Sequence, residues 1–215
     1  MSYKDYQNAR DASWRILLDC EVGRLPVDLN VICSKLHIKV RTYASAEGLV
    51  RKIGARGVTD GVLLYHHNQP LILYDGDLPS ARIRFTVAHE IGHLVLGHVA
   101  PGQRTTINRE LSPTDSPLET AANQFAARLL APACVLWGLG LHGADEIASA
   151  CHISMQAASF RADRMEHLYA RNKFLTSPLE REVYNRFLPY MEEIRGSRDH
   201  HRQCQSRQVP GYTQN

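Results

Sequence analysis

The stretch that most limits how this chain can fold is residues 80–98, SARIRFTVAHEIGHLVLGH. On a helical wheel its apolar side chains cover nearly the whole circumference, which is typical of a helix buried on all sides. The exception is one narrow sector that holds Thr86, His89, Glu90 and His93. Isolated polar groups in an apolar interior cost about 1–3 kcal/mol each, and an unpaired charge costs more. The segment therefore predicts a central helix whose polar sector has partners of its own.

A divalent metal ion is the simplest partner for that sector. His89 and His93 are four residues apart, so both imidazole rings lie on one face and can bind the same Zn²⁺. Glu90 lies beside them, where a carboxylate can act as a general base on water. The pattern is H-E-x-x-H, written here HEIGH, and the small Gly92 within it allows close packing. The alternative is a pair of core histidines satisfied by hydrogen bonds.

A catalytic zinc site needs a third protein ligand. The pattern with a further histidine three turns on does not apply, because Val99 stands at that position. His98 would point away from His89 if the helix continued, so we expect it at the helix end or on the surface. On spacing alone Glu119 and Glu110 both stay open as ligands, since a glutamate in the first turn of a helix is also common for electrostatic reasons.

Residues 118–132, LETAANQFAARLLAP, predict a second helix. Glu119 and Asn123 lie one turn apart at the margin of its apolar face. This spacing allows Glu119 to bind a metal ion while Asn123 hydrogen-bonds to a ligand histidine and orients it. The apolar stripe itself is formed by Leu118, Ala122, Phe125 and Leu129, with Gln124 and Arg128 facing away from it.

The remaining periodicities indicate an α+β fold that is mostly helical. Residues 5–22 have helical spacing, and a second short helix follows with Asp28 as its N-cap. Residues 38–44 alternate like a strand, and residues 61–67 and 70–75 indicate two more strands joined by a short turn. We expect a small antiparallel sheet packed on the helix that carries HEIGH, which is the minimal core of a zincin-like fold.

RFTVAHEIGHLVLGH, followed downstream by LETAANQFAARLLAP, resembles the ImmA/IrrE-type metallopeptidases, which are gluzincins of bacteria and their mobile elements. DGVLLYHHNQPLILYDGDLPSARI and LPVDLNVICSKLHIKV are similar to the segments that precede these motifs in that family, so the resemblance covers residues 5–170. It implies five site residues by position: His89, His93 and Glu119 as zinc ligands, Glu90 as general base, and Asn123 as the residue that orients a ligand.

The resemblance implies a zinc-dependent intracellular endopeptidase whose protein substrate is a helix-turn-helix transcriptional repressor. Ala121 stands where members often carry a second glutamate, which leaves Glu119 as the only carboxylate of the second motif. The alternative is a non-catalytic zinc-containing partner that binds a repressor or an antitoxin-like protein. Glu90 favours the enzyme, because a purely structural zinc site has no use for that base.

Two parts of the expected mechanism stay open in the sequence. A group that stabilises the oxyanion is needed, and Tyr65, His66, His67 and Tyr74 cannot be ranked for this role. An extended peptide can add to the edge of a sheet, so residues 61–67 are a candidate strand for binding the substrate.

We expect three parts along the chain. Residues 1–172 form the metallopeptidase domain, which includes a helical hairpin at about 145–172. Residues 173–195 form a C-terminal helix, and residues 196–215 are polar and expected to be disordered.

The hairpin has a second interpretation as a helix-turn-helix. Ser154 can cap its second helix, on which Arg161 and Arg164 lie. Acidic residues in the same segment cancel the positive charge that phosphate binding requires, however. We therefore expect a hairpin that packs beside the active-site core or docks the substrate, and no direct nucleic-acid binding.

The net charge and the cysteines limit which partners and which cellular compartment we expect. The formal net charge is only +3, which argues against a dedicated nucleic-acid binder. A chain with a net charge near zero fits a protein that binds another protein. The five cysteines are odd in number and contain no C-x-x-C pair, so we expect thiols in a reducing compartment. The charged N-terminus and the lack of a long apolar segment predict a cytoplasmic protein with no membrane anchor.

Overall fold

The structure is a computed structural model that describes residues 3–55, 59–100, 103 and 116–206. Its sheet has three strands in the order β1-β3-β2, with β2 at one edge. The strands are β1 (Lys39–Thr42), β2 (Gly61–His66) and β3 (Gln69–Tyr74).

The sheet is mixed, which differs in part from the prediction. Strands β2 and β3 form the expected antiparallel hairpin, and its turn residues His67 and Asn68 both have positive φ, as a two-residue type I′ turn requires. Strand β1 joins β3 in parallel instead, with Lys39 opposite Leu71. A parallel pair needs a long crossover, and helix α3 (Glu47–Ile53) together with β2 supplies it. The antiparallel pairing predicted for the strand pair is therefore confirmed, whereas β1 pairs in parallel.

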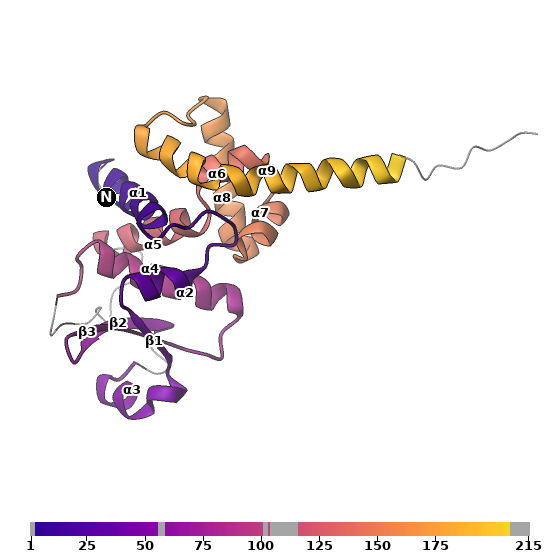
Figure 1. The fold of residues 1–215 in the computed structure, drawn as a ribbon. Coiled ribbons are helices and arrows are strands. Elements are labelled where there is room, and N and C mark those ends of the chain that lie inside the picture. Colours follow the sequence, from indigo (N-terminus) through magenta and orange to yellow (C-terminus); the bar gives the residue numbers. More distant parts are fainter. Residues whose placement is uncertain (1–2, 56–58, 101–102, 104–115, 207–215) are drawn as a thin grey trace, which may run out of the picture.

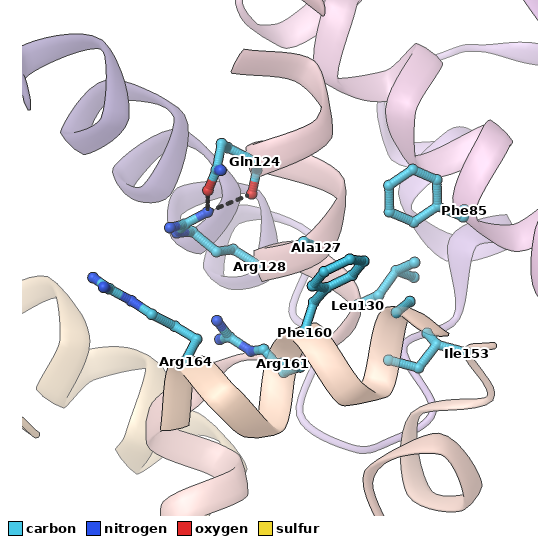
Figure 2. A pocket seen from close by; sticks show the side chains of 10 residues that line it. Phe85, Gln124, Ala127, Arg128, Leu130, Ile153, Phe160, Arg161 and Arg164 are labelled. Carbon is cyan, nitrogen blue, oxygen red and sulfur yellow. Dashed lines mark hydrogen bonds between the residues drawn. The ribbon is translucent and has the colours of Figure 1, made fainter. Parts of the chain in front are cut away.

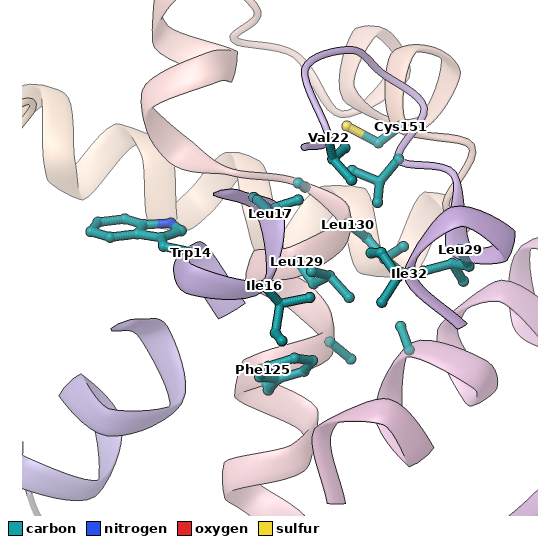
Figure 3. Packing of buried hydrophobic residues seen from close by; sticks show 14 of the residues in the cluster. Trp14, Ile16, Leu17, Val22, Leu29, Ile32, Phe125, Leu129, Leu130 and Cys151 are labelled. Carbon is teal, nitrogen blue, oxygen red and sulfur yellow. The ribbon is translucent and has the colours of Figure 1, made fainter. Parts of the chain in front are cut away.

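Helix α4 (Ser80–Val95) lies between the sheet and the other helices, as its apolar circumference predicts (Figure 1). Strands β2 and β3 contact one side of it and helix α5 (Pro117–Leu130) packs on another. Helix α1 (Tyr3–Asp19) covers α5, and α2 (Leu29–Lys35) contacts α4 after the N-cap predicted at Asp28, whose side chain accepts from the Asn30 N–H. Figure 3 shows the resulting core, which includes Ile16, Leu17, Ile32, Phe125, Leu129 and Leu130.

Gly92 allows α4 and α5 to approach closely. A Cβ atom at this position would lie 3.0 Å from Phe125 Cδ1 and 3.3 Å from the Ala122 Cα. The second neighbour is backbone, so the two helices themselves would have to separate. The prediction of close packing at Gly92 is confirmed.

Replacing Gly92 by alanine is expected to lower the free energy of unfolding by about 1–2 kcal/mol, because overpacking outweighs the gain in helix propensity. Urea denaturation measures this change. Gly48→Ala in α3 is the matched control, because nothing lies within 4 Å of a Cβ at Gly48. That variant gains propensity without a clash and is expected to be neutral or slightly stabilised. Equal stability of the two variants would contradict the close contact.

The predicted hairpin consists of α7 (Ala144–Cys151) and α8 (Met155–Ala170), which follow α6 (Ala133–Leu139). Ser154 caps α8 as expected, since its hydroxyl accepts from the Ala157 N–H at 3.2 Å. Arg161 is only 8% exposed, and its Nε donates to the Ala131 carbonyl oxygen at 2.7 Å. This side chain therefore ties α8 to the end of α5 and does not lie on an outer face.

Two details of α5 differ from the prediction. Arg128 does face away from α4, but it is only 5% exposed because a second layer of helices covers that side. Leu118 is 51% exposed although it continues the apolar stripe, because the first turn of α5 lies where α4 ends. Periodicity identified the face toward α4 but not the layer behind the helix.

The C-terminal helix extends further than expected. Helix α9 runs from Pro178 to Ser206, beyond residue 195, where the C-terminal helix was expected to end. Extending an existing helix is far easier than starting one, and residues 197–206 contain neither proline nor glycine. The rest of the expected tail, residues 207–215, lies outside the described residues.

The four cysteines whose side chains the structure describes are free and buried, which agrees with the expectation of thiols. Burial raises the pKa of Cys134 and of Cys151 to about 12, so both stay protonated. In the part of the chain that is described, no helix is both long and apolar enough to cross a membrane.

Candidate metal site

The three expected ligands meet where the C-terminal half of α4 faces the first turn of α5. Nε2 of His89 lies 3.1 Å from one Glu119 carboxylate oxygen, and Nε2 of His93 lies 3.3 Å from the other. The two Nε2 atoms are 3.0 Å apart. His93 is buried, while His89 and Glu119 are partly exposed, so the cluster opens to one side.

The spacing of these donor atoms fits one small divalent cation. Tetrahedral zinc with bonds of about 2.0–2.1 Å places its ligand atoms about 3.3 Å apart. The three observed separations, 3.0, 3.1 and 3.3 Å, lie close to that value. Two imidazoles and one carboxylate are also a donor set that zinc binds in catalytic sites. The residues present therefore fit a metal ion.

Asn123 holds His89 in the form that a metal needs. Its Oδ1 lies 2.9 Å from His89 Nδ1, and an amide oxygen only accepts, so Nδ1 is the protonated nitrogen. In a neutral ring this leaves the lone pair on Nε2, the atom that faces Glu119. The structure thus places Asn123 where the sequence predicted, one turn after Glu119.

His98 lies just past the end of α4, as expected, but it also contacts the cluster, which the sequence did not predict. Helix α4 ends at Val95, Gly97 has φ +72°, and the His98 N–H donates to the His93 carbonyl oxygen at 2.9 Å. This Schellman turn reverses the chain, so His98 does not continue the helical path. Its Nδ1 lies 3.0 Å from His93 Nδ1 instead.

His98 therefore supports His93 much as Asn123 supports His89. Burial, together with the nearby His93 charge, lowers the pKa of His98 to about 4, so this ring is neutral and can accept a hydrogen bond. The glycine two residues after the helix end was the signal in the sequence that a turn, and not a further helical step, brings His98 back.

Glu90 lies beside the cluster and is held by the edge strand of the sheet. Its carboxylate accepts a hydrogen bond from the Leu63 backbone N–H of β2. The side chain is 4% exposed, and its Oε2 has no hydrogen-bond partner among the described residues. A buried carboxylate oxygen without a donor is costly, so its presence here is better explained by chemistry than by stability.

Mutual charges and burial shift the pKa values in this group. Burial raises the pKa of Glu90 above its ordinary value, and the nearby His89 and His93 oppose that rise. Burial acts on Glu119 in the same sense, but the adjacent His89 and His93 rings favour its charged form, outweigh burial and lower the pKa of Glu119. The Glu119 carboxylate is therefore the charged group of the cluster, as a metal ligand should be.

The structure does not distinguish among the remaining candidates. Glu110, the rival carboxylate, lies outside the described residues. His66 and His67 are exposed at the hairpin turn, and Tyr65 and Tyr74 are half-buried strand residues, so their proposed role at the oxyanion stays a prediction. The strand proposed to bind substrate is β2, which is an edge strand. Two of its N–H groups already have partners: the Leu63 N–H is bonded to Glu90, and the Tyr65 N–H lies 3.4 Å from the Gln103 carbonyl oxygen. Its role in binding substrate stays a prediction.

The chain matches one known protein family over about half of its length. The IrrE N-terminal-like domain of the peptidase M78 family matches residues 49–163, a narrower span than the resemblance over residues 5–170. The match runs from α3 into α8 and includes HEIGH, Glu119 and Asn123. No curated protein matches the chain. Because the family match covers more than half of its length, the chain belongs to the IrrE N-terminal-like family of M78 peptidases.

Proposed function

We propose that this protein is a zinc-dependent endopeptidase in which His89, His93 and Glu119 hold the metal and Glu90 is the general base. The observation that carries the proposal is Glu90 itself. One of its oxygens is fixed by the Leu63 N–H, and the other is buried without a hydrogen-bond partner among the described residues beside the donor atoms of the metal ligands. A site built only to hold a structural ion has no need for such a group.

The residues divide the work in a way that follows from their contacts. Zinc, when bound, would supply a Lewis acid that polarises the scissile carbonyl and activates water. Glu90 accepts the proton as water attacks and delivers it to the leaving amine. Asn123 and His98 fix the orientation of the His89 and His93 rings, so neither ring needs to reorganise during the reaction.

The proposed substrate is a helix-turn-helix transcriptional repressor. The family supports a protein substrate, and the narrower class follows from the resemblance of the two central motifs. The formal charge of +3 on 215 residues agrees with a partner that is a protein. We further propose that the enzyme acts in the cytoplasm, where such repressors are found.

The test is cleavage of a purified repressor encoded beside the gene for this chain. Zinc-loaded enzyme is incubated with the repressor, and the products are identified by intact-mass spectrometry. We expect one defined cut that 1,10-phenanthroline abolishes and added Zn²⁺ restores. A stable complex with no cut under any inducing condition would refute the enzyme and support the non-catalytic regulatory partner.

A further inference from the structure

A cavity of about 340 Å³ lies among α1, α5, α8 and the start of α9, and none of the metal-site residues lines it. Its composition is unusual for a chain whose total charge is near neutral. Five arginines and one lysine line it, against the single carboxylate of Glu180. The cations are Arg10, Arg128, Arg161, Arg164, Arg171 and Lys173.

The cationic side chains lie at different depths in the cavity. Arg128 and Arg161 are buried, and each is oriented by the protein: Arg161 donates to the Ala131 carbonyl oxygen at 2.7 Å and Arg128 to the Gln124 carbonyl oxygen at 2.9 Å. Arg164 is exposed at the rim, as are Arg171 and Lys173 on the turn after α8. Figure 2 shows the guanidinium groups of Arg128, Arg161 and Arg164 on the side of their helices away from Phe85 and Ile153.

The carboxylate in the cavity has a structural task of its own. Glu180 is buried, and its Oε2 accepts from the Thr176 N–H at 2.9 Å, which closes the turn that begins α9. Its own N–H donates to Ser177 Oγ at 3.2 Å, as in a helix cap. Six cationic side chains and this one carboxylate give the lining a positive formal charge, although Arg10 also contacts Asp11 at 2.7 Å. An anion in the cavity would therefore lie in a favourable electrostatic environment.

Trp14 provides an independent sign that an acceptor belongs here. This residue lines the same cavity, and its Nε1 is buried with no hydrogen-bond partner among the described residues. An indole N–H only donates, and a buried one normally finds an acceptor. Arg10 lies over the indole ring at 4.8 Å from its centroid, so the tryptophan also helps to place one of the cations.

We propose that this cavity binds a small molecule carrying a chain of phosphate groups. The planar guanidinium fork matches phosphate oxygens in a bidentate way, and a row of phosphates can contact several cationic side chains of the lining at once. The volume lies at the lower end of ligand pockets, which suits a compact anion. A nucleic-acid duplex would not reach the deep pair, Arg128 and Arg161, because both are buried under neighbouring helices.

Calorimetric titration of the zinc-loaded full-length protein with inorganic tripolyphosphate tests the proposal. We expect saturable binding that weakens as salt is raised. Arg164→Gln and Arg171→Gln are each expected to weaken it about tenfold, since a hydrogen bond to a charged group is lost. Both side chains are exposed, so the fold should tolerate the changes, and thermal denaturation verifies this.

Two control variants test whether the effects are specific to the cavity. Lys173→Glu is expected to weaken binding. Lys52→Glu makes the same change of net charge on the distant helix α3 and is expected to leave binding unchanged (Figure 1). Phe160→Ala on α8 also leaves it unchanged, because Phe160 lines the neighbouring groove and not this cavity. Repeating the titration on Glu119→Gln separates binding in the cavity from capture of the metal ion by the phosphate chain.

ATP identifies the source of the phosphate chain. Equal affinity for ATP and tripolyphosphate indicates that the chain alone is recognised, and tighter binding of ATP indicates a nucleotide; both support the site. Absence of saturable binding by either compound, or binding that disappears in Glu119→Gln and persists in Arg164→Gln, would overturn it. A single-stranded oligonucleotide that binds more tightly than tripolyphosphate, with affinity rising with its length, would replace the proposed site by a nucleic-acid surface.

Discussion

Replacing Glu90 by glutamine is expected to reduce kcat/KM for peptide cleavage by at least about a thousandfold while fold and metal content stay intact. General acid–base catalysis contributes about 10²–10⁴-fold to a rate, and Glu90 is the group proposed to carry the proton in both steps. The glutamine carbonyl oxygen can still accept from the Leu63 N–H. Its amide nitrogen then takes the place of Oε2, which has no partner among the described residues, so little in the packing should change.

The measurement needs three readouts on one preparation. Zinc content by mass spectrometry and the midpoint of thermal unfolding should match the wild type, and only the rate should fall. Glu90→Asp is a graded companion, because it keeps the carboxylate but shortens its reach to the edge strand and should retain part of the activity. A Glu90→Gln enzyme within tenfold of the wild-type rate would show that another group is the base.

The chemistry of the site could be predicted from sequence because it depends on local geometry. His89 and His93 share a face through the i, i+4 spacing of one helix, and Glu119 and Asn123 share a face of another in the same way. The structure brings these pairs together, and the family match covers both motifs. The apolar circumference of α4 likewise predicted its central place between sheet and helices.

The parts that the sequence did not reveal depend on contacts between distant segments. Nothing in the alternation of residues 38–44 says whether that strand pairs in parallel, since this depends on where the crossover places β3. Arg128 is polar and lies outside the apolar stripe of α5, and only segments distant in the sequence bury it. The position of His98 beside His93 depends on the chain reversal at Gly97. Helical periodicity cannot be extended through a residue with positive φ, so it did not predict this position.

Glu119→Gln is expected to weaken zinc binding by more than a hundredfold and to abolish cleavage. The carboxylate is the only anionic member of the cluster, and it contacts both Nε2 atoms, at 3.1 and 3.3 Å. A neutral amide keeps the shape but removes the charge that balances a divalent cation. Competition with a chromophoric chelator measures the affinity without any need for activity.

Three companion variants make the result specific to this side chain. Asn123→Ala should cost about 10–100-fold in zinc affinity, because it removes the hydrogen bond that orients His89 but no ligand. Leu118→Ala, next to Glu119 but exposed on the same turn, should leave the affinity unchanged. Glu110→Gln should also bind zinc normally; if it loses the metal while Glu119→Gln keeps it, the third ligand is the rival carboxylate and the contact between α4 and α5 serves packing alone.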